Sequence, residues 1–208
     1  MIELLHIDCM EYMATLPDKA FDLAIVDPPY NVGRNYSQHD DNMQDVDYHK
    51  WCNKWFEELQ RISHTIVMTT GYKNLKFWFN LDPKHMIIWS KPNQNSPSPL
   101  GGFNAYEPVL FWGKLHKRFG HDLFTTNIKM QSDAAFHNCP KDLQSWKKLL
   151  KMCIDAPAKV FDPFLGSGTS AIASHYMGFD FVGCELDKDY YDAACKRFKE
   201  QTAQLSLL

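Results

Sequence analysis

Short apolar runs alternate with amphipathic segments along most of this chain. The apolar runs are rich in β-branched and aromatic residues and are short enough to be buried strands. The expected strands are Leu4–Ile7, Phe21–Val26, Thr65–Thr70, Met86–Trp89, Val109–Trp112, Lys159–Phe161 and Phe181–Glu185. The expected helices are Asp47–Ile62, Lys73–Phe79, Leu143–Ile154, Thr169–Met177 and Lys188–Gln201. This alternation predicts an α/β fold with a doubly wound, mixed and mainly parallel sheet.

Two polar stretches interrupt the pattern, and their composition predicts loops. They are Arg34–Gln44 and the Pro/Ser/Asn/Gly-rich segment Lys91–Asn104. Neither is followed by a second set of alternating elements, so neither is expected to link two domains. We therefore expect residues 1–208 to form a single domain.

The strand expected at Phe21–Val26 ends abruptly in Asp27-Pro28-Pro29-Tyr30. Prolines cannot extend a central strand, because they lack the N–H that the sheet requires. The sequence thus predicts a stiff loop at the carboxyl end of a buried strand. It would present an acid, an aromatic ring and backbone carbonyls that are free of sheet hydrogen bonds.

A second motif lies near the C-terminus, where a strand, a glycine-rich turn, a helix and another strand follow one another. Gly166 and Gly168 allow a close approach of the turn to a ligand, and Glu185 at the end of the next strand is placed to bind ribose hydroxyls. The turn also satisfies a loose G-x-G-x-x-A pattern, so a nicotinamide-dependent oxidoreductase is an alternative. Asp162-Pro163-Phe164 before the turn disfavours it, because a dinucleotide site usually runs from apolar strand directly into glycine.

Composition adds a few limits. The 208 residues contain 45% hydrophobic and 23% charged residues, and no run approaches the roughly 20 apolar residues of a membrane helix, so we expect a cytoplasmic protein. Six scattered cysteines without a C-x-x-C pair predict neither a disulfide framework nor a metal site. The net charge is −3, but residues 111–151 hold eight basic and three acidic residues, an excess that could face phosphates.

Taken together, "DPPY" and "FDPFLGSGT" resemble the motifs of S-adenosylmethionine-dependent amino-methyltransferases of DNA, which methylate adenine N6 or cytosine N4. The resemblance covers most of the chain, from "IDCMEYMATLPDKAFDLAIVDPPYN" to "FVGCELDKDYYDAACKRF". It implies a Rossmann-like methyltransferase fold with S-adenosylmethionine as cofactor. The order, with "DPPY" first, resembles the circularly permuted β group. "DPPY" rather than "SPPY" favours adenine N6.

The resemblance also implies roles for individual residues. Asp27 and the carbonyl of Pro28 would hold the amino group of the target base, stiffened by Pro29, and Tyr30 would stack on the base. A catalytic half (1–112) would be joined by a reduced recognition segment (113–136) to a cofactor half (137–208). His137 and Lys141 resemble a family element, "HPTQKP", that here reads "HNCPKD". The full set of expected cofactor-binding residues is Asp8, Cys9, Asp27, His137, Lys141, Phe161, Asp162, Phe164, Gly166, Ser167, Gly168, Thr169 and Glu185.

The expected partner is DNA, with double-stranded DNA favoured over RNA; a homodimer stays open, and no membrane contact is expected. Family members commonly carry a sizeable recognition segment where this chain has only the 24 residues Gly113–Phe136. We therefore expect a short or relaxed target. Base-reading residues would be Asn35, Gln38, Asn93 and Asn95, and phosphate-binding residues Lys114, Lys117, Arg118 and Lys129. Alternatives are a cytosine-N4 enzyme, an RNA or protein-amide methyltransferase and an inactive nucleic-acid-binding module.

Overall fold

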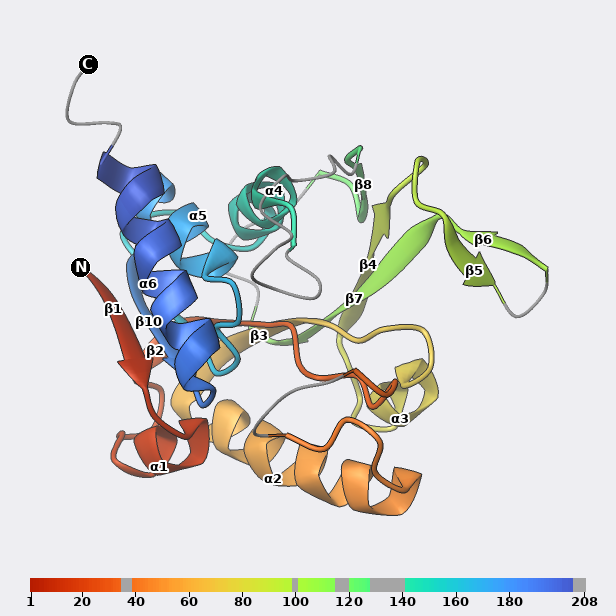
Figure 1. The fold of residues 1–208 in the computed structure, drawn as a ribbon, viewed down its shortest axis with the longest axis horizontal. Coiled ribbons are helices and arrows are strands. Elements are labelled where there is room, and N and C mark those ends of the chain that lie inside the picture. Colours follow the sequence, from red (N-terminus) through yellow and green to blue (C-terminus); the bar gives the residue numbers. More distant parts are fainter. Residues whose placement is uncertain (35–38, 99–100, 115–119, 128–140, 204–208) are drawn as a thin grey trace.

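One mixed sheet runs through the middle of the molecule (Figure 1). The computed structural model describes residues 1–34, 39–98, 101–114, 120–127 and 141–203. Within them, eight strands follow the order β1-β10-β9-β2-β3-β7-β4-β8, and β7 is antiparallel to both of its neighbours while the other pairs are parallel. The strands are β1 (Ile2–His6), β2 (Phe21–Val26), β3 (Ser63–Thr69), β4 (His85–Ser90), β7 (Tyr106–Gly113), β8 (Leu123–Thr125), β9 (Lys159–Asp162) and β10 (Asp180–Glu185).

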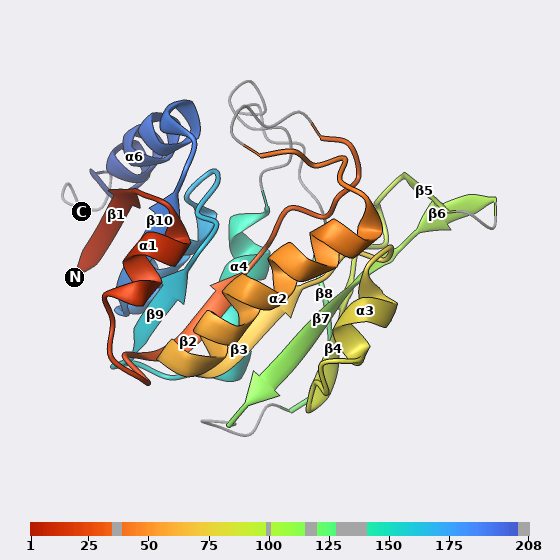
Figure 2. The same cartoon turned by 90° about the horizontal axis from the view of Figure 1, so that it is seen from below.

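Helices cover both faces of this sheet. Figure 2 shows one group of helices on the near face, and a second group packs on the far face. The near helices are α1 (Cys9–Ala14), α2 (Asp45–Ile62) and α3 (Leu75–Phe79); the far helices are α4 (Leu143–Cys153), α5 (Thr169–Met177) and α6 (Lys188–Ala203). This is the doubly wound arrangement that the sequence predicts, and the prediction of an α/β fold in one domain is confirmed.

The central strands are apolar over most of their length because both of their faces are buried. In β2, Leu23 and Ile25 join the core beneath α4 and α5, whereas Ala24 and Val26 join the core beneath α1, α2 and α3. Side chains alternate along a strand, so a strand covered on both sides shows a continuous apolar run rather than an alternating one. The prediction of a buried strand at Phe21–Val26 is confirmed.

Three features of the fold were not expected from the sequence. The short helix α1 follows β1, where Asp8 accepts a hydrogen bond from Met10 N at 2.7 Å as its N-cap. Lys91–Asn104, predicted to be a loop, contains a hairpin of β5 (Ser96–Ser98) and β6 (Gly102–Asn104). Strand β8, within the expected recognition segment, pairs with β4 at the edge of the sheet. Among the described residues, no helix is both long and apolar enough to span a bilayer.

Candidate active site

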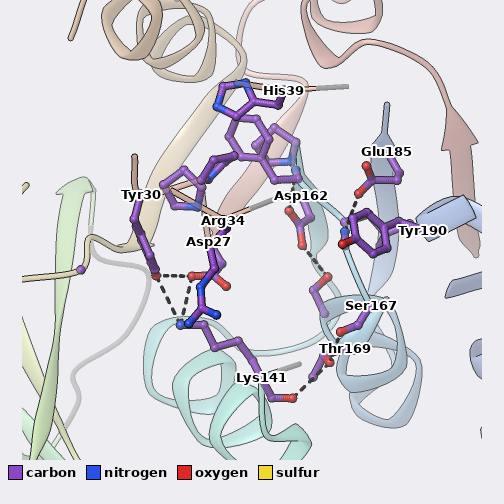
Figure 3. A pocket seen from close by; sticks show the side chains of 18 of the residues that line it. Asp27, Tyr30, Arg34, His39, Lys141, Asp162, Ser167, Thr169, Glu185 and Tyr190 are labelled. Carbon is purple, nitrogen blue, oxygen red and sulfur yellow. Dashed lines mark hydrogen bonds and ion pairs between the residues drawn. The ribbon is translucent and has the colours of Figure 1, made fainter. Parts of the chain in front are cut away.

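The two sequence motifs meet at one edge of the sheet because their strands are neighbours. Strands β2 and β9 are parallel, with Leu23 beside Val160 and Ala24 beside Phe161. Parallel neighbours end at the same edge, so Asp27 after β2 and Asp162 at the end of β9 come together there. Figure 3 shows Asp27 and Tyr30 on one side of the pocket and Glu185 on the other.

These strand ends enclose a cavity of about 700 Å³ that both motifs line. The expected site residues in its wall are Asp8, Cys9, Asp27, Pro28, Pro29, Tyr30, Lys141, Asp162, Phe164, Gly166, Ser167, Thr169 and Glu185. A single continuous space therefore connects the expected cofactor residues to the expected target residues.

Of the expected cofactor-binding residues that the structure describes, Phe161 and Gly168 are not in the cavity wall. Phe161 is fully buried and stacks on Phe21, with 4.9 Å between ring centroids. It precedes Asp162 by one residue, and alternation along β9 directs it into the core. Gly168 has a left-handed φ of +75°, and a Cβ there would lie 3.2 Å from the Cβ of Ala194. The close approach that its small size permits is to helix α6 rather than to a ligand.

The loop after β2 holds its carbonyl groups in a specific way. Tyr48 donates its hydroxyl to Pro29 O at 2.8 Å, Asn74 donates to Tyr30 O at 2.6 Å, and Lys73 donates to Asn31 O at 2.8 Å. Within the described part of the chain, no donor reaches the carbonyl of Pro28. Three successive carbonyls are thus occupied by side chains, while the carbonyl that was expected to receive the target amine is open.

Asp27 lies at the centre of a cluster of hydrogen-bond donors. Its Oδ1 accepts hydrogen bonds from Thr69 Oγ1 at 2.5 Å and from the Tyr30 hydroxyl, and Lys141 Nζ lies 3.1 Å from the same oxygen. Burial and the nearby carboxylates raise the pKa of Tyr30 well above its ordinary value, so the hydroxyl remains a donor. Lys141, expected to bind the cofactor, contacts the target-side acid instead.

Two further charged residues, Glu107 and Lys91, complete this cluster, and neither was predicted. Glu107 binds Lys141 at 2.6 Å through Oε1 and forms an ion pair with Lys91 through Oε2. Burial favours a neutral Glu107, but Lys141 and Lys91 outweigh that effect and lower its pKa to about 2. The sequence offered one signal: each residue is an isolated charge beside an apolar strand.

The ring of Tyr30 is positioned by a glycine. Gly71 has a φ of +61°, and a Cβ at this position would lie 3.2 Å from Cγ of Tyr30. Only a residue without a side chain lets the backbone approach the ring this closely. Tyr30 is partly exposed and lines the cavity.

At the other end of the cavity, two carboxylates are held mainly by backbone N–H groups and a hydroxyl. Asp162 accepts hydrogen bonds from Phe164 N at 2.9 Å and Ser170 Oγ at 2.5 Å. Burial is the main cause that raises its pKa to about 7. Glu185 accepts from Gly166 N at 2.7 Å and Asp187 N at 3.0 Å, and burial also raises its pKa.

An aromatic wall borders the same end and was also missed. Trp51 and Trp55, on α2, lie 5.8 and 5.1 Å from Phe164 between ring centroids, and all three line the cavity. Trp55 is almost fully buried, and its Nε1 has no hydrogen-bond partner among the described residues. The helix was predicted, but its two tryptophans could equally have been ordinary core residues.

The expected nucleic-acid contacts are only partly placed. Asn93 and Asn95 are exposed, follow the carboxyl end of β4 and do not line the cavity. Lys114 lies at the opposite edge of the sheet from the cavity, because β7 is antiparallel to β3 and ends beside His64. Asn35, Gln38, Lys117, Arg118, Lys129 and His137 lie outside the described residues. The described part contains no group of three or more His, Cys, Asp or Glu residues able to hold a metal.

The N6/N4 methyltransferase family model, described as DNA methylase, matches residues 21–196. The chain therefore belongs to this family of DNA methylases.

Individual relatives agree with this assignment. The chain is 27% identical to the type II methyltransferase M.HinfI of Haemophilus influenzae over 93% of this chain and 67% of that protein. It is 22% identical to M.HpaI of Haemophilus parainfluenzae, over 93% and 73%.

Two solved structures have the same fold. M1.HpyAVI in complex with SAM has a TM-score of 0.69 and 21% identity, covering 95% of this chain and 98% of that chain. The cytosine-N4-specific PvuII DNA methyltransferase has a TM-score of 0.75 and 14% identity, covering 96% and 89%.

Proposed function

We propose that this protein transfers a methyl group from S-adenosylmethionine to the N6 amino group of adenine in DNA. One observation carries the proposal: the Asp27 loop and the glycine turn line a single cavity, in which the carbonyl of Pro28 has no hydrogen-bond partner among the described residues. The order of the two motifs along the chain supports membership of the β group.

The residues at the far end of the cavity suit S-adenosylmethionine. Its sulfonium is cationic and its nucleoside combines a flat ring with a ribose. Trp51, Trp55 and Phe164 offer an apolar wall, and Glu185 offers carboxylate oxygens for ribose hydroxyls. The unpartnered Nε1 of Trp55 offers a donor that protein groups of the described chain do not use. The cofactor supplies an activated methyl group.

The chain's own residues would act on the target amine. The amine of adenine is a poor nucleophile because its lone pair is delocalised into the ring. Asp27 and the Pro28 carbonyl would accept hydrogen bonds from its two N–H groups. These bonds would turn the lone pair of the amine out of conjugation with the ring. Such acceptors, fixed before the reaction begins, work by positioning and electrostatics. Tyr30, supported by Gly71, would provide a flat face for a base taken out of the helix.

Adenine is proposed because of "DPPY" at positions 27–30, and DNA because of the family. Cytosine N4 is the second candidate, since its amine needs the same two acceptors and a cytosine-N4 enzyme shares the fold. RNA presents the same amine, and single-stranded substrates need no base flipping. Hydride transfer to a nicotinamide is disfavoured, because it gives Asp27 and the Pro28 carbonyl no role.

The proposal is tested by incubating the protein with methyl-labelled S-adenosylmethionine and unmodified double-stranded DNA, single-stranded DNA or RNA. We expect label in double-stranded DNA. Label in RNA alone would show that the substrate is RNA and not DNA. Binding of NAD, and none of S-adenosylmethionine, in calorimetry would overturn the assignment of the cavity.

A further inference from the structure

Glu107 lies at the start of β7, outside both motifs, yet it reaches the acid expected to hold the target amine through another side chain. It is only 8% exposed. Its Oε2 is paired with Lys91, while its Oε1 accepts a hydrogen bond from Lys141 Nζ at 2.6 Å and lies 3.1 Å from the Tyr30 hydroxyl oxygen.

Lys141 has three N–H groups and can donate to Glu107 and Asp27 at once, whereas Tyr30 has a single hydroxyl proton, and its shorter contact is with Asp27. Lys141 Nζ lies 3.1 Å from Asp27 Oδ1, and the Tyr30 hydroxyl is hydrogen-bonded to the same oxygen. Thr69 Oγ1 adds a third donor to Oδ1 at 2.5 Å. By contrast, Oδ2 of Asp27 accepts no hydrogen bond from the described residues. One carboxylate thus has a crowded oxygen and an open oxygen.

This asymmetry matters for an acid that must accept a hydrogen bond from a substrate. Three donors fill the acceptor positions of Oδ1 and fix the rotation of the carboxylate. Asp27 lines the cavity, so the oxygen left to a ligand is Oδ2. Glu107 anchors one of these donors, Lys141, from behind.

We propose that Glu107 is a positioning residue for methyl transfer: it holds Lys141 on Oδ1 of Asp27, so that Oδ2 is the oxygen presented to the target amine. The inference rests on the proposed function, because it concerns how the same acid is oriented. It adds an acid to the site that neither motif contains.

Charge balance gives the inference a second consequence. Glu107 and Asp27 face Lys141 and Lys91, two acids against two cations. If Glu107 loses its charge, both ammonium groups have only Asp27 to neutralise them. We then expect a cation to compete with the amine for Oδ2, in addition to the loss of the anchor.

The test is Glu107→Gln, which preserves shape and removes the charge. At saturating DNA and cofactor we expect kcat to fall about 10- to 100-fold, the range of a lost charged hydrogen bond. The Kd for S-adenosylmethionine should stay within about threefold of the wild-type value, because the partners of Glu107 are the target-side residues Lys91, Lys141 and Tyr30. Lys91→Met is the comparison: it disturbs the same buried charges but touches Glu107 only through Oε2, so its loss of kcat should be clearly smaller.

A double-mutant cycle separates positioning from general damage. If Glu107 acts through Lys141, adding Glu107→Gln to Lys141→Met should lower kcat by much less than it does in the wild type. If Glu107→Gln does not fold, Glu107→Asp replaces it, because it keeps the charge but is too short to hold Lys141 at the observed distance.

The outcomes are distinct. Loss of kcat with unchanged cofactor Kd and a non-additive cycle supports the inference. A kcat within threefold of wild type, an equal loss in Lys91→Met, or fully multiplicative effects with Lys141→Met would overturn it while leaving the proposed function intact. A wild-type protein that methylates no nucleic acid would overturn the proposed function and this inference with it.

Discussion

Asp27 and Asp162 occupy equivalent places, at the ends of neighbouring parallel strands and directly before a proline, yet their surroundings are opposite. Asp27 contacts Lys141 and two hydroxyl groups. Lys91 lies behind them and is paired with Glu107. Asp162 has no ion pair within the described chain and is held by one backbone N–H and the Ser170 hydroxyl. Its pKa is raised to about 7, chiefly by burial.

The contrast shows that a strand-end acid takes its chemical character from its neighbours rather than from its position. An acid that must accept hydrogen bonds from a neutral amine is served by fixed donors that orient its carboxylate. An acid in a buried glycine turn, held by backbone and hydroxyl donors, can organise the turn without a permanent charge. The same Asp-Pro dipeptide therefore supports two different tasks in one cavity.

The largest effect is expected at the target-side acid. Asp27→Ala should lower kcat by about 100-fold or more, since it removes a charged acceptor worth about 1.5–3 kcal/mol and also leaves the amine misoriented. The Kd for S-adenosylmethionine should change by less than about threefold, because the Asp27 carboxylate is bound to Tyr30, Thr69 and Lys141 rather than to the glycine turn. Stopped or single-turnover assays and calorimetry measure the two quantities separately. Near-normal turnover would show that Asp27 has no role in the chemistry.

The converse effect is expected at Glu185. Glu185→Ala should weaken S-adenosylmethionine binding about 10- to 100-fold, because ribose hydroxyls would lose a charged acceptor and the turn would lose its hydrogen bond from Gly166 N. At saturating cofactor, kcat should change little. Glu185→Gln, which retains one acceptor oxygen, is the matched control and should lie between. An unchanged cofactor affinity in Glu185→Ala would separate this residue from the cofactor site.

Asp162 predicts a pH dependence of stability. Its folded pKa of about 7 lies above its ordinary value of 3.8, so the folded state binds more protons than the unfolded state between these values. The free energy of unfolding should therefore fall as pH rises through this window, by at most about 1.4 kcal/mol per pH unit from this one group. Asp162→Asn should remove that contribution. Denaturant unfolding at pH 5, 6 and 7 measures it, and a difference between the two proteins that is constant with pH would contradict the prediction.

The smallest effect concerns the support of Tyr30. Gly71→Ala places a side chain 3.2 Å from the Tyr30 ring at a positive φ, so it should lower stability by about 1–2 kcal/mol and reduce kcat about tenfold by moving the ring. Gly178→Ala is the matched control: its φ is +74° but no atom lies within 4 Å of the added Cβ. Both variants should lose stability, and only Gly71→Ala should lose activity. Equal activity in the two would show that Gly71 does not position Tyr30.

Sequence reasoning located the parts of this site that lie on single strands. The ends of β2, β9 and β10 follow from continuous apolar runs, and the prolines and glycines after them mark the loops. Asp27, Asp162 and Glu185 could be found in this way, because each lies at the end of a readable strand.

Contacts between distant strands could not be read in the same way. Glu107 and Lys91 reach the site only because β7 runs antiparallel between β3 and β4, which places the start of β7 beside the ends of the other two. The same reversal carries Lys114 to the far edge of the sheet. The number of basic residues in a segment does not reveal the direction of the strand that precedes them. Phe161 was expected to line the cofactor site for a related reason: one residue along β9 changes the face of the sheet to which a side chain points.

Mass spectrometry of the modified nucleoside tests most directly whether this chain methylates the exocyclic amine of a base that Asp27 holds. Unmodified DNA is incubated with S-adenosylmethionine and either the wild-type protein or Asp27→Ala, then digested to nucleosides. We predict N6-methyldeoxyadenosine from the wild type and none from Asp27→Ala. N4-methyldeoxycytidine would correct the base while preserving the amine chemistry. A methyl group on a ring carbon, or equal methylation by Asp27→Ala, would contradict it.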